Sequence, residues 1–266
     1  MNPIRWLKGI YRTRKASSAK RNILVAPILA GDPEDFAASL EDPTRYYLRA
    51  FQDFHNNLPV TFREHRTYFS ANGRGFGEDA FHIMWWRLFK KFKPASFLEI
   101  GIYRGQVLSL IALLAKEEGV AIHTAGVSPF CPAGDSVSRY RDNLDYQQDT
   151  LANFQHFNLP VPDLLKAYST DPEAVAFIKS RSWDMIYIDG NHDAEIVRKD
   201  WEVCSASVPV GGIIVLDDAG LTTSYKPPAF ATGGHPGPSQ IATEIDPARF
   251  REILQVGHNR VFQRIA

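Results

Sequence analysis

The chain has 266 residues, its 30 lysines and arginines balance its 30 aspartates and glutamates, and it contains two cysteines. This length is enough to bury a full hydrophobic core, and the zero net charge argues against a nucleic-acid partner. Cys131 and Cys204 have no metal-ligand spacing, so a disulfide scaffold and a zinc ribbon are excluded and a cytoplasmic protein is expected.

The first 22 residues form a basic segment. They contain seven lysines and arginines and no acidic residue, so the remainder of the chain carries the compensating negative charge. Ile4, Leu7 and Tyr11 lie near helical spacing, which suits contact with a membrane surface or an acidic partner; a frayed, solvated terminus is the alternative. The apolar run at 23–29 is too short to span a bilayer.

Residues 1–93 show no alternation of strands and helices. They are predicted to form a helical N-terminal extension, which could serve as a substrate lid or an oligomerisation element. Short helices are expected at 33–40 and 43–54, because each begins with a proline where the first helical turn tolerates it.

A longer amphipathic helix is expected at 78–92, after a glycine-rich loop at 73–77. Its apolar face must be buried, and the edge of a sheet is the expected partner. That face comprises Phe81, Trp85, Leu88 and Phe92. Trp85 and Trp86 also offer apolar surface for a homo-oligomer.

From residue 94 onward strands and helices alternate, which is typical of a parallel sheet covered on both faces. Strands are expected at 96–100, 121–127, 163–168, 184–189 and 212–217, with helices at 105–118, 146–157, 172–181 and 193–207. A hairpin at 251–256 and 259–265 completes a doubly wound, mostly parallel, seven-stranded α/β domain over 94–266. The segment 221–238, rich in glycine, proline and threonine, is predicted to be a functional loop.

The first strand ends in the motif Glu99-x-Gly101-x-x-x-Gly105. Glycines there leave the turn free of side chains where a ligand must approach the backbone, although they could serve only a tight turn and close helix packing. Tyr103 stands where a dinucleotide fingerprint requires its second glycine, so a nicotinamide cofactor is not expected.

In this context the motif resembles the first motif of class I S-adenosylmethionine-dependent methyltransferases. The resemblance implies a Rossmann-like fold in which Glu99 holds the amino group of the cofactor and the glycines admit it. The second strand lacks the family's ribose-binding acid, so Ser128 and Asp135 are the candidates for that contact. The predicted cofactor contacts are Glu99, Gly101, Tyr103, Gly105, Ser128, Thr170, Asp171 and Asp189, with a role as helix N-cap as the alternative for Asp171.

Two later strands end in acidic residues, Asp189 in Ile-Asp-Gly-Asn-His192 and the pair Asp217-Asp218. Because ligands bind beyond the carboxyl ends of parallel strands, these carboxylates should converge and could share one cation. Oxygen ligands favour Mg²⁺, with Mn²⁺ or Ca²⁺ as substitutes. Capping of the loop without any metal is the alternative.

This second motif is similar to that of metal-assisted O-methyltransferases, closest to the macrocin O-methyltransferase and cephalosporin hydroxylase-like group. The resemblance implies that Asp189, Asp217 and Asp218 are metal ligands. His192 is predicted to be the general base, although a lone histidine is more often structural. Asp193 is assigned to the first turn of the next helix and could orient His192.

Other polar residues give weaker signals. His235 lies in the predicted loop and could touch the substrate, whereas His258 in the hairpin turn is expected to be solvated. Asp200 is assigned to the outer surface of a helix.

The sequence therefore predicts an enzyme, an S-adenosylmethionine-dependent methyltransferase. We expect it to methylate a hydroxyl group of a small molecule or a sugar with the help of a divalent cation. A metal-independent methyltransferase, a hydroxylase-like relative and a non-catalytic cofactor-binding scaffold remain alternatives.

Overall fold

The computed structural model describes residues 3–132, 135, 137 and 140–266, with residues 3–12 as backbone only. Its strands form one sheet in the order β3-β2-β1-β4-β5-β7-β6. The strands are β1 (Ser96–Ile100), β2 (His123–Ser128), β3 (Asp163–Lys166), β4 (Met185–Ile188), β5 (Ile213–Leu216), β6 (Phe250–Val256) and β7 (Asn259–Arg264). The first five pair in parallel and the last two are antiparallel, so the predicted doubly wound fold is confirmed.

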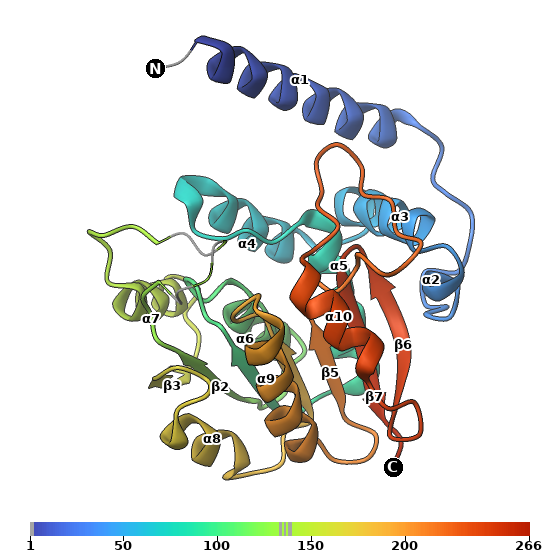
Figure 1. Ribbon diagram of the computed structural model, residues 1–266. Coiled ribbons are helices and arrows are strands. Elements are labelled where there is room, and N and C mark those ends of the chain that lie inside the picture. The colour runs from blue at the N-terminus through green and yellow to red at the C-terminus, as the bar shows by residue number, and fades with distance from the viewer. Residues whose placement is uncertain (1–2, 133–134, 136, 138–139) are drawn as a thin grey trace.

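Helices cover both faces of this sheet (Figure 1). One face, called the α5 face here, packs mainly against α3 (Pro43–Asn56), α5 (Asp79–Phe92), α6 (Gln106–Glu117) and α7 (Tyr146–His156). The opposite face packs against α8 (Pro172–Lys179), α9 (Ala194–Ser207) and α10 (Pro236–Glu244). The remaining helices are α1 (Pro3–Val25), α2 (Ala38–Glu41), α4 (Val60–Ser70) and the short 3₁₀ turn η1 (Ala71–Gly73).

The register of the strands brings three acidic residues together. Side chains alternate between the two faces of a strand, and along β1, β4 and β5 this alternation turns Glu99, Asp189 and Asp217 toward the α5 face. Ile188 pairs with Leu216, so the next residues, Asp189 and Asp217, are neighbours across the sheet. The sequence pattern thus places these carboxyl groups at one end of one face.

Helix α5 differs from the prediction in what it covers. Trp85 packs edge-on against Phe97 of β1, with ring centroids 5.9 Å apart, and against Tyr187 of β4 at 5.0 Å. Both strands lie in the middle of the sheet, so the expected packing on a sheet edge is wrong. Trp85 is only 2% exposed and therefore offers no surface for self-association.

The predicted loop at 221–238 is shorter than expected, because α10 begins at Pro236. Proline is tolerated in a first helical turn, and Ile241 and Ala242 bury this helix against the face opposite α5. A Cβ atom on Gly237 would lie 2.0 Å from the His192 carbonyl oxygen. The start of α10 is thus packed directly on the turn that carries His192.

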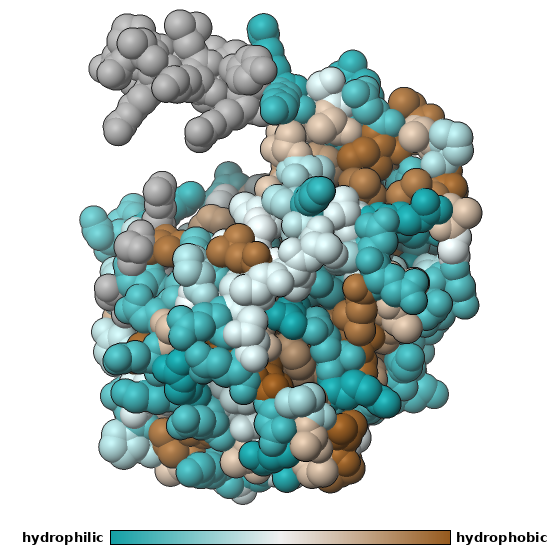
Figure 2. Space-filling model, turned by 45° about the vertical axis from the view of Figure 1, so that its right-hand side comes forward, coloured by the Kyte–Doolittle hydropathy of each residue, from teal (hydrophilic) through white to brown (hydrophobic). Residues whose placement is uncertain are grey.

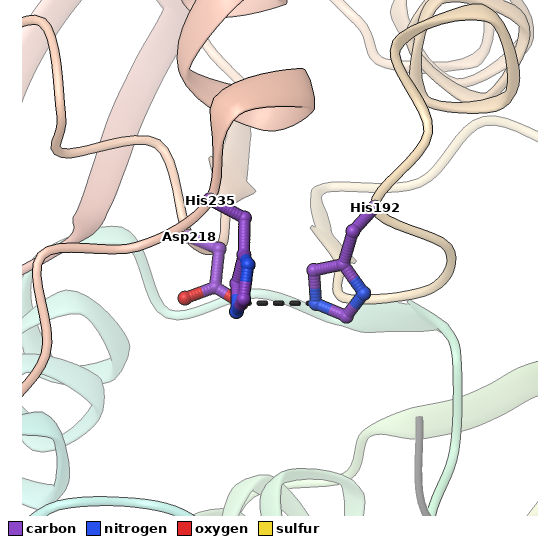
Figure 3. A group of neighbouring side chains, drawn as sticks. All are labelled: His192, Asp218 and His235. Carbon is purple, nitrogen blue, oxygen red and sulfur yellow. Dashed lines mark hydrogen bonds and ion pairs between the residues drawn. The ribbon is translucent and has the colours of Figure 1, made fainter. Parts of the chain in front are cut away.

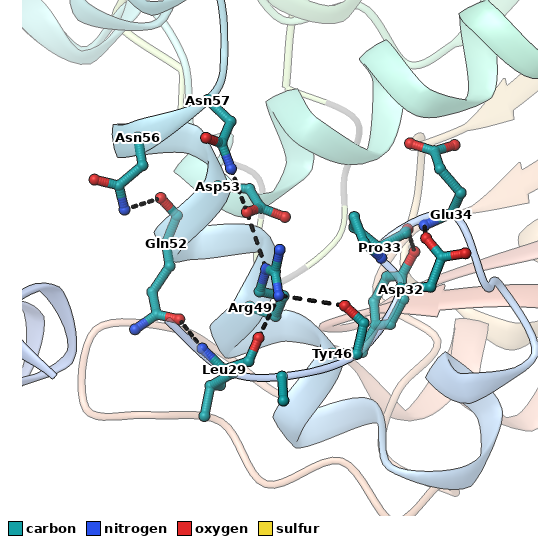
Figure 4. Close-up of polar contacts among 12 residues, drawn as sticks. Leu29, Asp32, Pro33, Glu34, Tyr46, Arg49, Gln52, Asp53, Asn56 and Asn57 are labelled. Atoms are coloured by element: carbon teal, nitrogen blue, oxygen red, sulfur yellow. Dashed lines mark hydrogen bonds and ion pairs between the residues drawn. The ribbon is translucent and has the colours of Figure 1, made fainter. Parts of the chain in front are cut away.

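Of the N-terminal segment, the predicted helix at 33–40 shortens to the four residues of α2, while α3 agrees with the sequence pattern. Side chains of α3 hold the segment that precedes it (Figure 4). Gln52 accepts a hydrogen bond from the Leu29 amide at 2.9 Å, and Tyr46 donates one to the Pro33 carbonyl at 2.8 Å. Arg49 adds an ion pair with Asp53 at 3.0 Å.

Helix α1 runs from Pro3 to Val25 and lies outside the two helical layers (Figure 1). The predicted apolar positions Ile4, Leu7 and Tyr11 lie outside the side chains that the structure describes. Among the described residues, no helix is long and apolar enough to cross a membrane. The face in Figure 2 is mostly hydrophilic, with apolar residues in small groups.

Candidate active site

A cavity of about 640 Å³ opens at the carboxyl ends of the parallel strands, where α/β proteins of this type bind ligands. Its walls come from the turns after β1, β2, β3, β4 and β5, from the start of α5 and from the β6–β7 turn. Six of the eight predicted cofactor residues line it, namely Glu99, Gly101, Tyr103, Ser128, Thr170 and Asp189. Gly105 and Asp171 lie outside the lining.

Glu99 presents an unused hydrogen-bonding group to this cavity. The side chain is 3% exposed, and its Oε2 atom has no hydrogen-bond partner among the described residues. Burial raises the pKa of this carboxyl to about 8. A buried carboxyl oxygen without a donor is costly, and an ammonium group in the cavity would both pair with Oε2 and favour the ionised form of Glu99.

The two motif glycines serve close packing. Gly101 has φ +93°, and a Cβ atom there would lie 1.9 Å from the carbonyl oxygen of Asp189. Gly105 has φ +77°, and a Cβ atom there would lie 2.7 Å from Thr150. Both glycines are therefore needed for close packing of the chain, as the alternative interpretation of the motif expected. Gly101 also lines the cavity.

Ser128 and Asp171 are engaged by the protein itself. The Ser128 hydroxyl donates to the Ile102 carbonyl at 2.9 Å and accepts from the Phe130 amide at 3.2 Å. Asp171 precedes α8, but its carboxylate accepts from the Tyr168 amide at 3.0 Å and caps no helix amide. Asp171 is thus the N-cap residue of α8, as the alternative predicted, but its side chain turns back toward the end of β3 instead of bonding the helix amides.

Asp189 and Asp217 form a hydrogen-bonded pair of carboxyl groups. Burial and then the charge of Asp217 raise the pKa of Asp189 well above its usual range. Burial would also raise the pKa of Asp217, but the positive charge of His258 and the hydrogen bonds to this carboxylate together outweigh it and lower the pKa to about 2. The pair therefore shares one proton, which Asp189 retains.

His192 lies between two carboxylates. Its Nδ1 atom is 2.7 Å from Asp135, and its Nε2 atom is 3.0 Å from Asp218. Burial would lower the pKa of His192, but these hydrogen bonds outweigh it and raise the pKa to about 9. Asp135, rather than the predicted Asp193, orients the ring, because the loop after β2 folds over the turn after β4.

His235 also approaches the carboxylate of Asp218 (Figure 3). Its Nε2 atom lies 3.7 Å from Asp218, and its ring centroid is 4.5 Å from that of His192. His235 lines the cavity, in agreement with the prediction that it could face a ligand. The φ of Asp218 is +54°, a conformation rare for residues other than glycine, and it ends the strand sharply at this point.

His258 contradicts the prediction that it is solvated. It lies in the predicted hairpin turn but is only 7% exposed, because Phe81 packs on its ring with centroids 4.8 Å apart. Its Nε2 atom is 3.4 Å from Asp217, an ion-pair distance. Burial opposes its charge, but Asp217 prevails and raises the pKa of His258 to about 10.

Asp200 is also placed differently from the prediction. It is 2% exposed rather than on the outer surface of α9, and burial raises its pKa to about 7. Asp200 does not line the cavity.

Glu78 does line the cavity, and it accepts a hydrogen bond from Tyr47 at 2.6 Å. No sequence motif marks Glu78, because its position in the cavity depends on how α5 packs against the sheet.

The site has the donor set of a cation-binding centre. Two groups of the described residues bring three potential ligand atoms within 4.8 Å of one another, and Asp218 belongs to both. The groups are His192, Asp218 and His235, and Asp217, Asp218 and His258. The Oδ1 atom of Asp217 is buried and has no hydrogen bond among the described residues, so it could accept an ion.

Comparisons with known proteins agree with this geometry. Residues 98–219 match a family model described as a methyltransferase domain. Uncharacterized protein R132 of Acanthamoeba polyphaga mimivirus is 27% identical over 125 residues, which are 46% of this chain and 51% of that protein. The match thus spans about half the length of this relative.

Solved structures share the fold at low sequence identity. An O-methyltransferase from Bacillus cereus in complex with SAH is 13% identical with a TM-score of 0.54, over 80% of this chain and 95% of that one. The SAH-bound methyltransferase PaMTH1 of Podospora anserina is 15% identical with a TM-score of 0.54, over 91% and 100% of the two chains. The chain therefore has the Rossmann-like class I methyltransferase fold.

Proposed function

We propose that this protein is an S-adenosylmethionine-dependent O-methyltransferase that acts on a hydroxyl group of a small molecule or sugar. The observation that carries the proposal is the unpaired Oε2 atom of Glu99 at the wall of the cavity above Gly101. The methyltransferase-domain match over 98–219 supports it. In this proposal residues 94–266 form the catalytic domain and residues 1–93 an extension that helps to bind the acceptor.

The cofactor would lie along the turns after β1, β2 and β3. Glu99 binds its amino group, and Gly101, Tyr103, Ser128 and Thr170 line the space beside it. Bound in this position, S-adenosylmethionine supplies an electrophilic methyl group that needs alignment more than acid or base catalysis. The acceptor would enter from the side of α5 and the loop before α10, where Glu78, Thr232 and His235 line the same cavity.

A divalent ion is proposed beside the cofactor, with Asp189, Asp217 and Asp218 as its ligands. Such an ion lowers the pKa of a bound hydroxyl group. His192 is the proposed base, because Asp135 can hold its Nδ1–H while Nε2 accepts the proton of the acceptor. Since Asp218 keeps the ring protonated, His192 can act in this way only once Asp218 is engaged by a cation.

A metal-independent methyltransferase is the second candidate, and one observation favours it. Asp217 and Asp218 already have positive partners in His258 at 3.4 Å and His192 at 3.0 Å. Turnover that survives removal of divalent ions by a chelator would support this candidate, whereas turnover that requires added Mg²⁺ or Mn²⁺ supports the first.

Binding of S-adenosylmethionine measured by calorimetry tests the proposal. Glu99→Gln should weaken binding about 10–100-fold, because a charge-assisted hydrogen bond to the amino group is lost. Glu78→Gln is the matched control, since it alters another carboxyl group of raised pKa that lines the same cavity, and it should bind the cofactor normally. A folded wild-type protein that binds no cofactor would leave a non-catalytic scaffold as the better account.

Three further properties stay predictions. These are a cytoplasmic location, contact of residues 1–22 with a membrane surface or an acidic partner, and self-association. Each can be tested directly, by fractionation of cells, by vesicle binding and by light scattering.

A further inference from the structure

We propose that His258 supplies a nitrogen ligand to the divalent ion at Asp217 and Asp218, so that the site takes a first-row transition ion in preference to Mg²⁺. This inference rests on the metal-assisted reaction proposed above. It adds a ligand that the acidic strand ends do not provide and assigns the class of ion.

The distances fit a shared ion. The ligand atoms of Asp217, Asp218 and His258 all lie within 4.8 Å of one another. His258 Nε2, the atom proposed to bind the ion, is 3.4 Å from Asp217 Oδ1. Ligands about 2.1 Å from one ion are separated by comparable distances, so little movement is required.

His258 is held in place by the loop that follows β5. The Ala219 amide donates to the His258 carbonyl at 2.8 Å, and a Cβ atom on Gly220 would lie 2.9 Å from the His258 Cα atom. The hairpin turn and the end of β5 are therefore packed against each other. This contact fixes the backbone of His258 relative to Asp217 and Asp218.

The ring of His258 also has the support that is typical of a metal ligand. Its Nδ1 atom lies 3.0 Å from the Thr232 hydroxyl and 3.3 Å from the Thr232 carbonyl. A hydrogen bond from Nδ1–H to that carbonyl leaves the lone pair on Nε2, the atom that faces Asp217. Histidines that bind metals usually donate their second ring N–H to a carbonyl or carboxylate in this way.

An unsatisfied oxygen points to the same place. Asp217 Oδ1 is buried without a hydrogen bond among the described residues, and His258 beside it is 7% exposed. Its nearest cationic neighbour among the described residues is His258 Nε2, at an ion-pair distance of 3.4 Å, and an ion between the two side chains would satisfy this oxygen directly.

The other two histidines near Asp218 fit the role less well. The Nδ1 atom of His192 is anchored by Asp135 at 2.7 Å, but this side chain is 17% exposed, against 9% for that of His258, and His192 is the proposed base. The His235 side chain is 33% exposed and lies 3.7 Å from Asp218. His258 alone among the three combines burial with an anchored second nitrogen.

A nitrogen ligand changes the preferred ion. Mg²⁺ binds oxygen ligands and keeps several waters, whereas first-row transition ions also accept imidazole. A site with carboxylates and one imidazole should therefore bind Mn²⁺ at least about tenfold more tightly than Mg²⁺.

Pulsed electron paramagnetic resonance of Mn²⁺ bound to the full chain, without cofactor or acceptor, tests this directly. We expect nitrogen hyperfine coupling in the wild-type protein that persists in His235→Gln and His192→Gln and disappears in His258→Gln. Mn²⁺ affinity should fall about 10–100-fold in the last variant alone. His258→Gln could fail to fold, and then isotopic labelling of histidine replaces it. A nitrogen hyperfine coupling that changes with this label and persists in His235→Gln and His192→Gln supports the inference equally.

Results that contradict the His258 ligand differ from results that contradict metal assistance as a whole. Bound Mn²⁺ without nitrogen coupling, coupling that is lost in His235→Gln, or equal affinity for Mn²⁺ and Mg²⁺ would overturn the inference alone. Failure to bind either ion would overturn both the inference and metal assistance, while cofactor binding by calorimetry would still decide on the methyltransferase itself.

Discussion

Two pairs of histidines differ in charge: His65 and His82, on α4 and α5, are neutral, whereas His192 and His258, in the turns after β4 and β6, are positively charged. His65 is 3.2 Å from His82, and its other ring nitrogen is 3.0 Å from the Ser109 hydroxyl. Burial lowers the pKa of His65 to about 3 and that of His82 well below its usual range. His192 and His258 are buried beside carboxylates instead, and their pKa values rise to about 9 and 10.

The comparison shows that burial alone does not decide the charge of a histidine. Neutral partners leave the cost of burying a charge uncompensated, whereas a carboxylate at hydrogen-bond distance repays it. The His65–His82 pair is therefore a structural part of the α5 face. The charged pair marks the region where chemistry is proposed.

The largest expected effect is on turnover, when a carboxylate near the charged pair His192 and His258 is removed. Asp189→Ala should lower methyl transfer at least about 1,000-fold, because a ligand and its charge are lost where the acceptor oxygen is activated. Cofactor affinity should stay within about threefold. Transfer of labelled methyl groups to a panel of hydroxylated small molecules and sugars, together with calorimetry, provides the measurement.

The control for this variant is Asp200→Asn, which changes another buried carboxyl of raised pKa that does not line the cavity. It should retain most of the turnover. Normal turnover in Asp189→Ala would remove Asp189 from the ligands of the ion.

The next effect is on the stability of the protein in acid, and it tests the neutral pair His65 and His82. The folded-state pKa of His65 lies below its ordinary value of 6.5, so the folded protein favours the neutral ring. The stability that neutral His65 contributes is fully present above pH 6.5 and is lost as the pH falls, because the unfolded chain then binds a proton that the folded protein does not. At pH 5 the loss should reach about 2 kcal/mol, since each unit below the ordinary value costs about 1.4 kcal/mol. Urea unfolding of the wild-type protein and of His65→Asn at pH 7 and pH 5 should show a smaller drop in the variant; parallel curves would contradict the assignment.

A smaller effect is expected on the protonation of His192. Asp135→Asn removes the charge that accepts from Nδ1, so the pKa of His192 should fall from about 9 by at least about one unit. Nitrogen chemical shifts of the imidazole, followed by NMR over pH without divalent ions, report this value. An unchanged pKa would mean that Asp218 alone holds the proton.

The smallest effect concerns a single neutral hydrogen bond. Ser109→Ala should lower the free energy of unfolding by about 1 kcal/mol, because the buried Nε2 atom of His65 loses its partner. Ser180→Ala serves as the control, since this exposed hydroxyl only donates to the Phe177 carbonyl, and its effect should stay within about 0.5 kcal/mol. Equal effects in denaturant unfolding would show that Ser109 does not support the pair.

The sheet and its acidic ends could be predicted from local pattern. Short apolar runs that end in Glu99, Asp189 and Asp217 predict strands, and the rule for parallel sheets brings their carboxyl ends together. Alternation along the strands then directs these side chains to one face. Both steps use only short-range information, which is why they agree with the structure.

The histidine partners depend on contacts between distant segments. The hairpin turn at His258 was visible in the sequence, but its burial depends on Phe81 from α5 and on the loop after β5. Asp135 reaches His192 from 57 positions away. The packing of Trp85 on the middle strands likewise depends on topology, since the apolar face of a helix does not reveal which part of a sheet it covers.

A crystal structure with SAH and Mn²⁺ tests the central claim most directly, that the acidic ends of β1, β4 and β5 bind cofactor and ion side by side. We predict the amino group of SAH at hydrogen-bond distance from Glu99, above Gly101. Anomalous scattering from manganese should give one peak in contact with Asp217 and Asp218. Density for SAH outside the cavity, or a manganese peak away from both aspartates, would contradict the account.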